Sequence, residues 1–410
     1  MIDLRAARAD RERFRAALAR KGADELFDAL IAADERWREL ETKSGELRAR
    51  RKLQGKPTPE QLEELNRVKG ELQEVEEELA RVERQRRDLW DRVPNPPDDS
   101  APDGFTEDEA EELRRVGERR DFAFGPLDHL DLAARHGWID MDRGARVSGS
   151  RFAYRLGDFA LLELALYRWA LERLVQKGFT PVLPPVLVRE QAMYGTGFLP
   201  TDDMNIYFIE RDGLYLTGTS EVSLAALHMD EILDEEALPV RYAGYSTNFR
   251  REAGAAGKDT RGMFRVHQFD KVEMFVFCRP EESPEAHEAL LAVEEELVGE
   301  LGLPYRIVNV AAGDLGASAA KKYDIEAWFP AQERYREITS TSNTTDYQAR
   351  RLDMRFRREG KPELVHTLNG TAVTARALLA VLENFQEDDG SIAVPPVLAE
   401  FGAPRSLASA

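Results

Sequence analysis

The fold of this chain is decided by residues 249–273, which read FRREAGAAGKDTRGMFRVHQFDKVE. The apolar and β-branched residues on either side of the glycine-rich basic segment predict one strand over residues 245–252 and a returning strand over residues 266–277. Such a hairpin would carry four chemically useful side chains on a single sheet: Arg250, Glu252, Phe269 and Glu273. The hairpin is therefore the first candidate for a binding site.

These side chains suit a nucleotide. An arginine neutralises an α-phosphate, a carboxylate accepts a hydrogen bond from the adenine amino group, and an aromatic ring stacks on the base. An ordinary hairpin with a charged turn carries a bare Arg-x-Glu equally well. The residue types alone therefore leave both interpretations open.

The whole stretch resembles the second signature sequence of class II aminoacyl-tRNA synthetases, in the form used by the seryl-tRNA synthetases. The resemblance implies that Arg250 binds the α-phosphate of ATP and that Glu273 binds serine. The ATP-binding residues that it implies in this segment are Arg250, Arg251, Glu252, Val266 and Phe269.

Composition bounds the class of protein. A chain of 410 residues is too long for one compact core and fits two or three domains. There is no run of about 18 apolar residues and no apolar signal region at the N-terminus, so we expect no membrane segment, no export and a cytoplasmic location. The single cysteine, Cys278, excludes a disulfide framework, and the six histidines are scattered. We expect a buried, inert thiol and no zinc.

Two heptad seams lie within residues 26–93. Their apolar positions alternate at spacings of four and three. The first seam is Leu26, Leu30, Ala33, Trp37, Leu40, Ser44 and Leu47, and the second is Leu65, Val68, Leu72, Val75, Leu79, Val82, Leu89 and Val93, interrupted by Arg86. Between the seams, Thr58 can cap the second helix, with Pro59 at its first position and Gln61 closing a capping box. The pattern predicts an antiparallel coiled-coil hairpin of two matched helices, roughly 45 to 50 Å long at about 1.5 Å per residue.

The tip of this predicted hairpin is basic, whereas most acidic residues lie nearer its base. The basic residues are Arg48, Arg50, Arg51, Lys52 and Lys56. The formal charge of −19 argues against unselective binding of nucleic acids, because phosphate affinity comes from Lys and Arg. A local basic tip can still reach a phosphate backbone. A dimerisation or spacer coil is the plain alternative.

The segment PNPPDDSAPDG, residues 94–104, is a linker by composition and predicts a domain boundary near residue 100. Beyond it, helices are expected over residues 158–177 and 282–301, and strands such as residues 305–310 follow in hairpin order. This order favours an α+β fold in which an antiparallel sheet is flanked by helices. We expect residues 1–100 and 101–410 to be the two domains.

The segment GFTPVLPPVLV, residues 178–188, reads as an extended stretch punctuated by proline. Prolines of this kind occur at sheet edges, so a simple edge strand explains the pattern. The segment also resembles the first class II signature, which in that family forms the homodimer interface.

The segment LTGTSEV, residues 216–222, can begin a helix that runs toward Met229, with Thr219 as its cap and Glu221 in the first turn. In the seryl enzymes a Thr-x-Glu at this place holds the amino acid. The resemblance therefore implies that Thr219, Ser220 and Glu221 bind serine.

The segment REITSTSN, residues 336–343, places Glu337 and Ser340 at a polar strand end. Their oxygens can hold Mg²⁺ that bridges ATP phosphates, although a strand-to-turn junction with solvated hydroxyls explains the same residues. The segment resembles the Glu-Ile-Ser-Ser element of the family, with Thr339 in place of the first serine. By resemblance Glu337, Ile338, Thr339 and Ser340 bind ATP.

Residues 367–386 read as a strand that turns into a helix, with Arg376 near the start of the helix. The helix dipole disfavours a cation there, and a site that binds an anion explains it. The segment resembles the third class II signature, whose arginine grips the γ-phosphate. Thr371, which stands where many relatives have serine, is implied as a serine-binding residue.

The resemblance covers nearly the whole chain, which is identified as a member of the bacterial-type seryl-tRNA synthetases. It implies a homodimeric ligase in which Arg250 and Arg376 catalyse the activation of L-serine by ATP and Mg²⁺. Serine then passes to serine tRNA, and to selenocysteine tRNA where present, with the arm reading the tRNA variable arm. No class I signature and no P-loop occurs. Two alternatives are a ligase that charges a carrier protein and an inactive coiled-coil scaffold.

Overall fold

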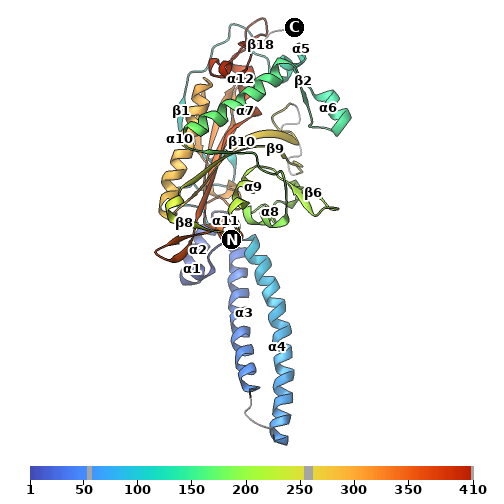
Figure 1. Ribbon diagram of the computed structural model, residues 1–410, viewed down its shortest axis with the longest axis vertical. Helices are drawn as coiled ribbons and strands as arrows, with labels where there is room; N and C mark the ends of the chain where they lie inside the picture. The colour runs from blue at the N-terminus through green and yellow to red at the C-terminus, as the bar shows by residue number, and fades with distance from the viewer. Residues whose placement is uncertain (53–57, 254–261, 408–410) are drawn as a thin grey trace. The chain divides into compact units, whose positions relative to one another are not determined.

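The computed structural model describes residues 1–52, 58–253 and 262–407 and divides into two compact units, Met1–Pro96 and Pro97–Ala410 (Figure 1). The division therefore comes four residues before the boundary expected at residue 100. Within the described residues, no helix combines the length and the apolar character needed to cross a membrane.

The first unit is helical, as the heptad pattern predicts. It consists of α1 (Leu4–Ala9), α2 (Arg11–Ala19), α3 (Asp24–Arg50) and α4 (Pro59–Arg92). Thr58 caps α4, and the side chain of Gln61 completes the expected capping box. The two long helices are not matched in length, because α3 has 27 residues and α4 has 34.

The seam between α3 and α4 contains one buried ionic cluster. Asp34 is fully buried, with Oδ1 2.7 Å from Arg86 Nε and Oδ2 2.8 Å from Arg8 Nη1. The guanidinium of Arg86 also lies 4.6 Å from the ring centroid of Trp37 and 5.2 Å from that of Trp90. The arginine that interrupts the heptads is therefore paired, and the seam around it is apolar.

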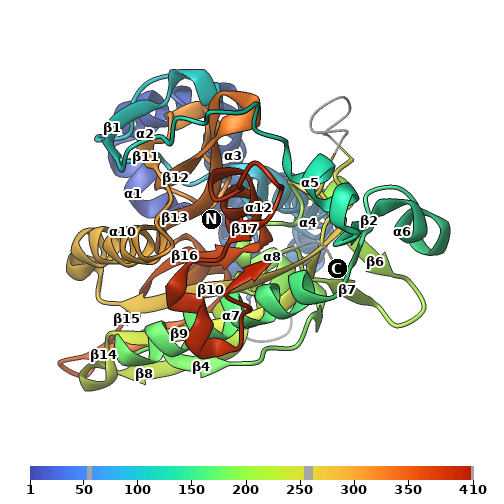
Figure 2. The same ribbon diagram turned by 90° about the horizontal axis from the view of Figure 1, so that it is seen from above.

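The second unit is built on an eight-stranded sheet in the order β1-β11-β12-β13-β16-β10-β9-β4. Figure 2 shows this order from β1 at the top of the view to β4 at the bottom. All neighbouring strands are antiparallel except β4 and β9, which are parallel. The strands are β1 (Glu111–Val116), β4 (Thr180–Val182), β9 (Val240–Phe249), β10 (Gln268–Cys278), β11 (Tyr305–Asn309), β12 (Lys321–Phe329), β13 (Arg334–Thr345) and β16 (His366–Thr374).

Helices cover both faces of this sheet. Side chains of α7 and α10 pack on the face that carries Val272, Met274 and Val276, and side chains of α9 and α11 pack against Phe275 and Phe277 on the other face. Cys278 is buried and unpaired. The helices are α5 (His129–His136), α6 (Met141–Ser148), α7 (Asp158–Gln176), α8 (Glu190–Thr196), α9 (Glu221–Ala225), α10 (Ser283–Glu300), α11 (Tyr347–Leu352) and α12 (Ala375–Asn384).

Short strands form four smaller sheets around the large one. They are β2 (Ile139–Asp140) with β3 (Tyr154–Arg155); β5 (Leu187–Val188), β6 (Tyr207–Ile209) and β7 (Leu214–Leu216); β8 (Ile232–Asp234), β14 (Arg355–Arg358) and β15 (Lys361–Leu364); and β17 (Ile392–Ala393) with β18 (Ser406–Leu407).

The decisive hairpin is β9 and β10, but its strands are displaced from the predicted ranges. β9 ends at Phe249, so Arg250 and Glu252 follow the strand instead of lying on it. The backbone N–H of Arg250 still donates to the carbonyl of His267 at 3.0 Å, whereas Glu252 has a positive φ of 51° and leaves the strand direction. At Arg251 the backbone N–H donates to the carbonyl of Asn205 at 2.8 Å, so the chain has left the pairing with β10 before it reaches Glu252.

Candidate active site

A central cavity of about 310 Å³ opens beside the hairpin, over strands β10, β13 and β16 and the start of α12. It brings together most of the predicted ATP-binding residues. Those that line it are Arg250, Glu252, Val266, Phe269, Glu337, Ile338, Ser340 and Arg376. Thr371, predicted to bind serine, lines it as well. Segments more than a hundred residues apart in the chain therefore share one site.

Arg376 lies at one end of the central cavity, where β16 turns into α12. Thr374 caps the helix, and its hydroxyl accepts from the backbone N–H of Arg376 at 3.2 Å. The guanidinium of Arg376 stacks on the ring of Phe264 at 4.5 Å, and Nη1 lies 3.3 Å from Glu337 Oε1. Arg336 stacks on the same ring at 3.7 Å. Phe264 thus holds the cation of the third signature in place through cation–π contact.

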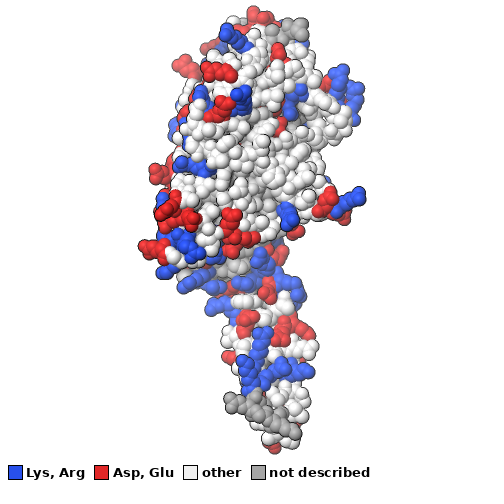
Figure 3. All heavy atoms as spheres, viewed as in Figure 1, with Lys and Arg blue, Asp and Glu red and all other residues white. Residues whose placement is uncertain are grey.

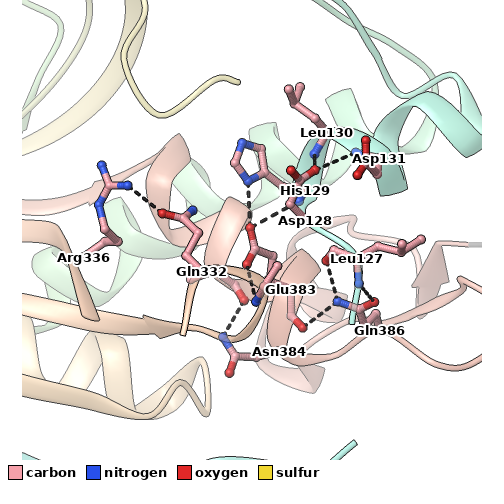
Figure 4. Close-up of polar contacts among 12 residues, drawn as sticks. Leu127, Asp128, His129, Leu130, Asp131, Gln332, Arg336, Glu383, Asn384 and Gln386 are labelled. Atoms are coloured by element: carbon pink, nitrogen blue, oxygen red, sulfur yellow. Dashed lines mark hydrogen bonds and ion pairs between the residues drawn. The ribbon is translucent and has the colours of Figure 1, made fainter. Parts of the chain in front are cut away.

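The far end of α12 is anchored by a polar cluster (Figure 4). Glu383 Oε1 accepts from the backbone N–H of His129 at 3.2 Å and lies 2.8 Å from His129 Nδ1. The side chain of Gln386 bonds both the N–H and the carbonyl of Leu127 at 2.9 Å. The helix that presents Arg376 is therefore tied down at the opposite end from its functional residue.

A β-bulge in β13 places the two predicted metal ligands on one face. In a regular strand Glu337 and Ser340, three residues apart, would face opposite sides. Here Glu337 pairs with Glu326 and Thr339 with Ile325, so Ile338 has no partner. Glu337 and Ser340 consequently both line the central cavity. They lie inside β13, not at a strand end as we expected.

The same bulge turns Thr339 away. Its side chain is buried, and its hydroxyl donates to Glu294 Oε2 of α10 at 3.1 Å. Glu294 is fully buried, and burial raises its pKa well above the usual range. Thr339, which the resemblance places at ATP, therefore directs its side chain to the opposite face of the sheet.

The Glu337 carboxylate is ionised and ready to accept a cation. Burial opposes its ionisation, but the positive charges of Arg376, Lys322 and Arg250 outweigh this effect and hold its pKa at about 2. Lys322, which the sequence did not single out, lines the cavity and pairs with Asp324 at 3.0 Å. A carboxylate and a hydroxyl on one wall fit a hard cation that keeps water and phosphate ligands. No cluster of three or more His, Cys, Asp or Glu able to hold a metal ion is found among the described residues.

The hairpin residues Arg250, Glu252 and Phe269 line another part of the cavity. The guanidinium of Arg250 lies 5.4 Å from the centroid of the Phe269 ring, and its Nε donates to the carbonyl of Gly218 at 3.0 Å. Glu252 forms an ion pair with Arg265. The expected Arg251 is exposed and does not line the cavity; its backbone N–H donates to the carbonyl of Asn205 at 2.8 Å.

The acidic pocket, as we call it, is the group of buried side chains around Lys271, which itself lines the central cavity. The Nζ atom of Lys271 lies 2.6 Å from Glu273 Oε2 and donates to the hydroxyl of Thr219 at 2.7 Å. Thr371 donates to the same Glu273 oxygen at 3.3 Å. A second bulge, at Ala372 of β16, sets Thr371 opposite Glu273. Lys271 was not among the predicted site residues, although the alternation of side chains along a strand places it on the same face as Phe269 and Glu273.

Glu221 is the second acid of this pocket. Its Oε1 accepts from the side chain of Gln348 at 2.7 Å. Burial, reinforced by the nearby charge of Glu273, raises the pKa of Glu221 to about 7 despite Lys271. The hydroxyl of Thr219 accepts from the Glu221 N–H at 3.2 Å, but the N-cap of α9 is Ser220 and not Thr219 as predicted. The helix is short and passes into a 3₁₀ turn that ends at His228.

Ser220, the third residue of this motif, is turned away from the acids. Its side chain is buried, and its hydroxyl donates to the carbonyl of Gly244 in β9 at 3.3 Å. Ser220 therefore fixes the motif to the sheet.

At the end of the helical hairpin, the predicted basic tip is partly neutralised. Arg48 lies 2.9 Å from Glu76, and Arg50 lies 2.5 Å from Glu64. Arg51 and Lys52 are exposed. Lys56 lies outside the described residues. Two of the five predicted cations, Arg48 and Arg50, therefore form ion pairs with glutamates of α4.

An apolar face runs along α7 and β4. Figure 3 shows few charged side chains over the middle of this face of the second unit. Leu164 of α7 is 61% exposed, and Leu183, just after β4, is 80% exposed. Other exposed large apolar residues here are Leu161, Val175 and Leu187. Exposed apolar residues that gather in one region are typical of interaction surfaces.

Comparisons with known proteins agree with the geometry. One family model, the N-terminal domain of seryl-tRNA synthetase, matches residues 1–97. A second, the class II core domain of tRNA synthetases (G, H, P, S and T), matches residues 207–385. The chain is 49% identical to a serine–tRNA ligase of Thermobifida fusca (98% of this chain, 97% of the relative) and 48% identical to one of Streptomyces coelicolor (99% of each).

Solved structures give the same picture. The chain superposes on a seryl-tRNA synthetase of Pyrococcus horikoshii, complexed with ATP, with a TM-score of 0.93, 40% identity and full coverage of both chains. It superposes on a cytoplasmic serine–tRNA ligase of Naegleria fowleri, in complex with AMP, with a TM-score of 0.85 and 34% identity over 96% of this chain and 94% of that one.

Proposed function

We propose, because this chain belongs to the seryl-tRNA synthetase family, that it is an ATP-dependent ligase that joins L-serine to serine tRNA. The observation that carries the proposal is that Lys271 lines the central cavity and also pairs with Glu273, so the cavity adjoins the acidic pocket. The cavity supplies cations for phosphates and a ring for a base. The pocket supplies carboxylates for an ammonium group.

In the first step, the serine carboxylate attacks the α-phosphate of ATP and pyrophosphate leaves. Arg250 and Arg376 neutralise the phosphate charge, and Phe269 stacks on adenine while Glu252 accepts from its amino group. Glu337 and Ser340 would hold Mg²⁺, which neutralises phosphate charge when bound. No side-chain nucleophile is needed, because the substrate carboxylate is itself the nucleophile.

The acidic pocket would bind the serine ammonium and hydroxyl groups. Glu221 and Glu273 offer two carboxylates and Lys271 offers one balancing cation, so one negative charge is left for the ammonium. Thr371 and Thr219 would add hydroxyl partners. Buried polar groups that pair with the serine hydroxyl reject alanine, which would leave them unpaired, by about 10⁴-fold or more.

In the second step, the terminal ribose hydroxyl of the tRNA attacks the seryl-adenylate. The helical hairpin α3–α4 would bind the tRNA, with the exposed Arg51 and Lys52 as its phosphate contacts. The apolar face along α7 and β4 would be the homodimer interface. We place the enzyme in the cytoplasm, where translation supplies its tRNA.

A pyrophosphate-exchange assay with each of the twenty amino acids tests the activation step. We expect exchange with serine only. A ligase that charges a carrier protein would lack a use for the helical hairpin, and deletion of residues 30–90 separates the two cases. Serine transfer to tRNA should be lost while exchange persists.

A further inference from the structure

A layer of charged side chains separates the central cavity from a second, side cavity. The side cavity has a volume of about 440 Å³ and lies among α6, β3, α7 and the start of β10. Arg155, Glu163 and Gln268 border both cavities. Arg155 and Glu163 lie outside the signature segments, and the proposed reaction uses neither of them.

Arg155 joins three elements through this layer. Its Nε lies 2.6 Å from Glu163 Oε2 of α7, and its Nη2 donates to Asp270 Oδ2 of β10 at 3.1 Å. Asp270 also accepts from the hydroxyl of Thr247 in β9. Glu163 Oε1 accepts from the hydroxyl of Tyr167 at 2.8 Å. The side chains of Arg155, Glu163 and Asp270 are 23%, 5% and 11% exposed, so water screens these contacts weakly.

Through Asp270, this layer ties the part of β10 that carries Phe269 to α7, in addition to the pairing of that part with β9. Further along the strand, Val272, Met274 and Val276 pack into the apolar core beneath α7 and α10. At the start of the strand, the residue on that face is Asp270, and its neighbour Phe269 faces the central cavity. Beyond the end of the apolar core, the ion pair between Arg155 and Asp270 holds the start of β10 in place.

We infer that Arg155 is a positioning residue for the adenine site: it holds the start of β10 against α7 and so fixes the plane of Phe269. The inference rests on the proposed function, in which Phe269 stacks on adenine. It concerns only ATP, because the serine pocket around Glu273 lies further along β10, where the apolar core backs the strand.

The charge balance of the layer gives the inference a specific signature. Arg155 is one cation between two carboxylates, and burial already raises the pKa of Glu163 despite it. The groups that face this pair are Tyr167 of α7 and Tyr245 and Thr247 of β9. Without Arg155, two buried carboxylates repel each other when both are ionised. Protonation of either carboxylate removes this repulsion.

The test compares Arg155→Met with the wild-type protein by serine-dependent pyrophosphate exchange between pH 6 and pH 8.5. We expect KM for ATP to rise on the order of tenfold at pH 8, as for the loss of a coupled contact. The rise should shrink toward pH 6. KM for serine and the melting temperature should change little. Adding Glu163→Gln to Arg155→Met should remove the pH dependence and recover most of the ATP affinity.

Two further variants serve as references. Arg168→Met removes a cation from α7, the helix that carries Glu163; Arg168 forms a surface ion pair with Glu172 and is 67% exposed, so this variant should leave all parameters unchanged. Phe269→Ala should raise KM for ATP at every pH. If Phe269→Ala has no effect, the adenine assignment itself is wrong.

If Phe269→Ala weakens ATP binding but Arg155→Met does not, the positioning role is overturned and the adenine site stands. Equal increases in both KM values, independent of pH, would make Arg155 a general structural residue and would also overturn the inference. Should Arg155→Met fail to fold, the Arg155→Met, Glu163→Gln double variant and Arg155→Lys carry the same comparison.

Discussion

The Nζ atom of Lys271 lies 2.6 Å from the Oε2 atom of Glu273, inside the pocket where a serine ammonium would bind. Lys271 is 6% exposed and Glu273 is 2% exposed, so neither can exchange its partner for water. With Glu221 beside them, the acidic pocket contains two acids and one base. Serine would bring the second positive charge that balances the set.

The pH dependence of serine binding follows from Glu221. Burial raises its folded-state pKa to about 7, so it is largely protonated below that pH and ionised above it. A serine ammonium prefers the carboxylate, so KM for serine should fall as pH rises from 6 to 8, by up to about tenfold per pH unit well below the pKa. Measuring KM for serine across this range checks the sign. Glu221→Gln should flatten the dependence of KM for serine on pH. A flat dependence in the wild-type protein would contradict the assignment of Glu221 to the serine site.

The thermal stability of the protein without serine should fall as pH rises, whereas its affinity for serine should increase. An acid whose folded pKa is raised loses stabilisation as pH rises from its unfolded pKa to its folded pKa. For Glu221 this interval runs from about 4.5 to about 7. The gain in melting temperature on adding serine should therefore be larger at pH 8 than at pH 6. Equal gains at both pH values would mean that Glu221 does not face the ligand.

Lys271→Met should move the serine profile to higher pH. Lys271 lowers the pKa of Glu221, so its removal leaves the two carboxylates sharing a proton to a higher pH. KM for serine at pH 7 should rise, and the midpoint of its pH dependence should shift upward by about one unit or more. KM for ATP gives the internal control. An unshifted midpoint would place Lys271 outside the serine site.

Arg250→Ala and Arg376→Ala should each nearly abolish serine-dependent pyrophosphate exchange. Both guanidiniums face phosphate charge that develops in the transition state, and loss of one such donor costs on the order of 10² to 10³ in rate. Circular dichroism and gel filtration should show an unchanged fold and oligomeric state. Near-wild-type exchange in either variant would refute the site.

Charge reversal at the tip should weaken tRNA binding through its salt dependence. The exposed Arg51 and Lys52 are the best-placed described cations, since Arg48 and Arg50 pair with glutamates. Arg51→Glu with Lys52→Glu should flatten the log–log salt slope by roughly one unit per lost phosphate contact. Arg81→Glu, on the shaft of the hairpin, is the matched control. An unchanged slope would point to recognition by helix faces.

The elements that could be predicted from the sequence are those fixed by local chemistry. Thr58, Pro59 and Gln61 placed the start of α4, and the helix after Thr374 begins where the sequence predicts. Regular alternation could not reveal which strand residues have no partner across the sheet. That property depends on neighbours far away in the chain, so the shared face of Glu337 and Ser340 could not be predicted.

Other differences have the same origin in tertiary contacts. Arg86 broke the predicted seam without breaking the coiled coil, because the buried Asp34 pairs with it. Lys271 was overlooked because a lysine in a strand is ordinarily a surface residue. Only the approach of Thr219 from another segment shows that its charge is enclosed.

Because Ile338 and Ala372 have no partner in the pairing of β13 with β12 and of β16 with β10, the site depends on the number of residues in β13 and β16. Exchange of either side chain leaves the reading frame of the sheet intact, whereas loss of the residue itself rotates every following position to the other surface. Substitutions in β13 and β16 should therefore be tolerated more readily than insertions or deletions of residues. For an engineer, deletion at either position should abolish activity although Arg250, Glu273 and Arg376 all remain in the sequence.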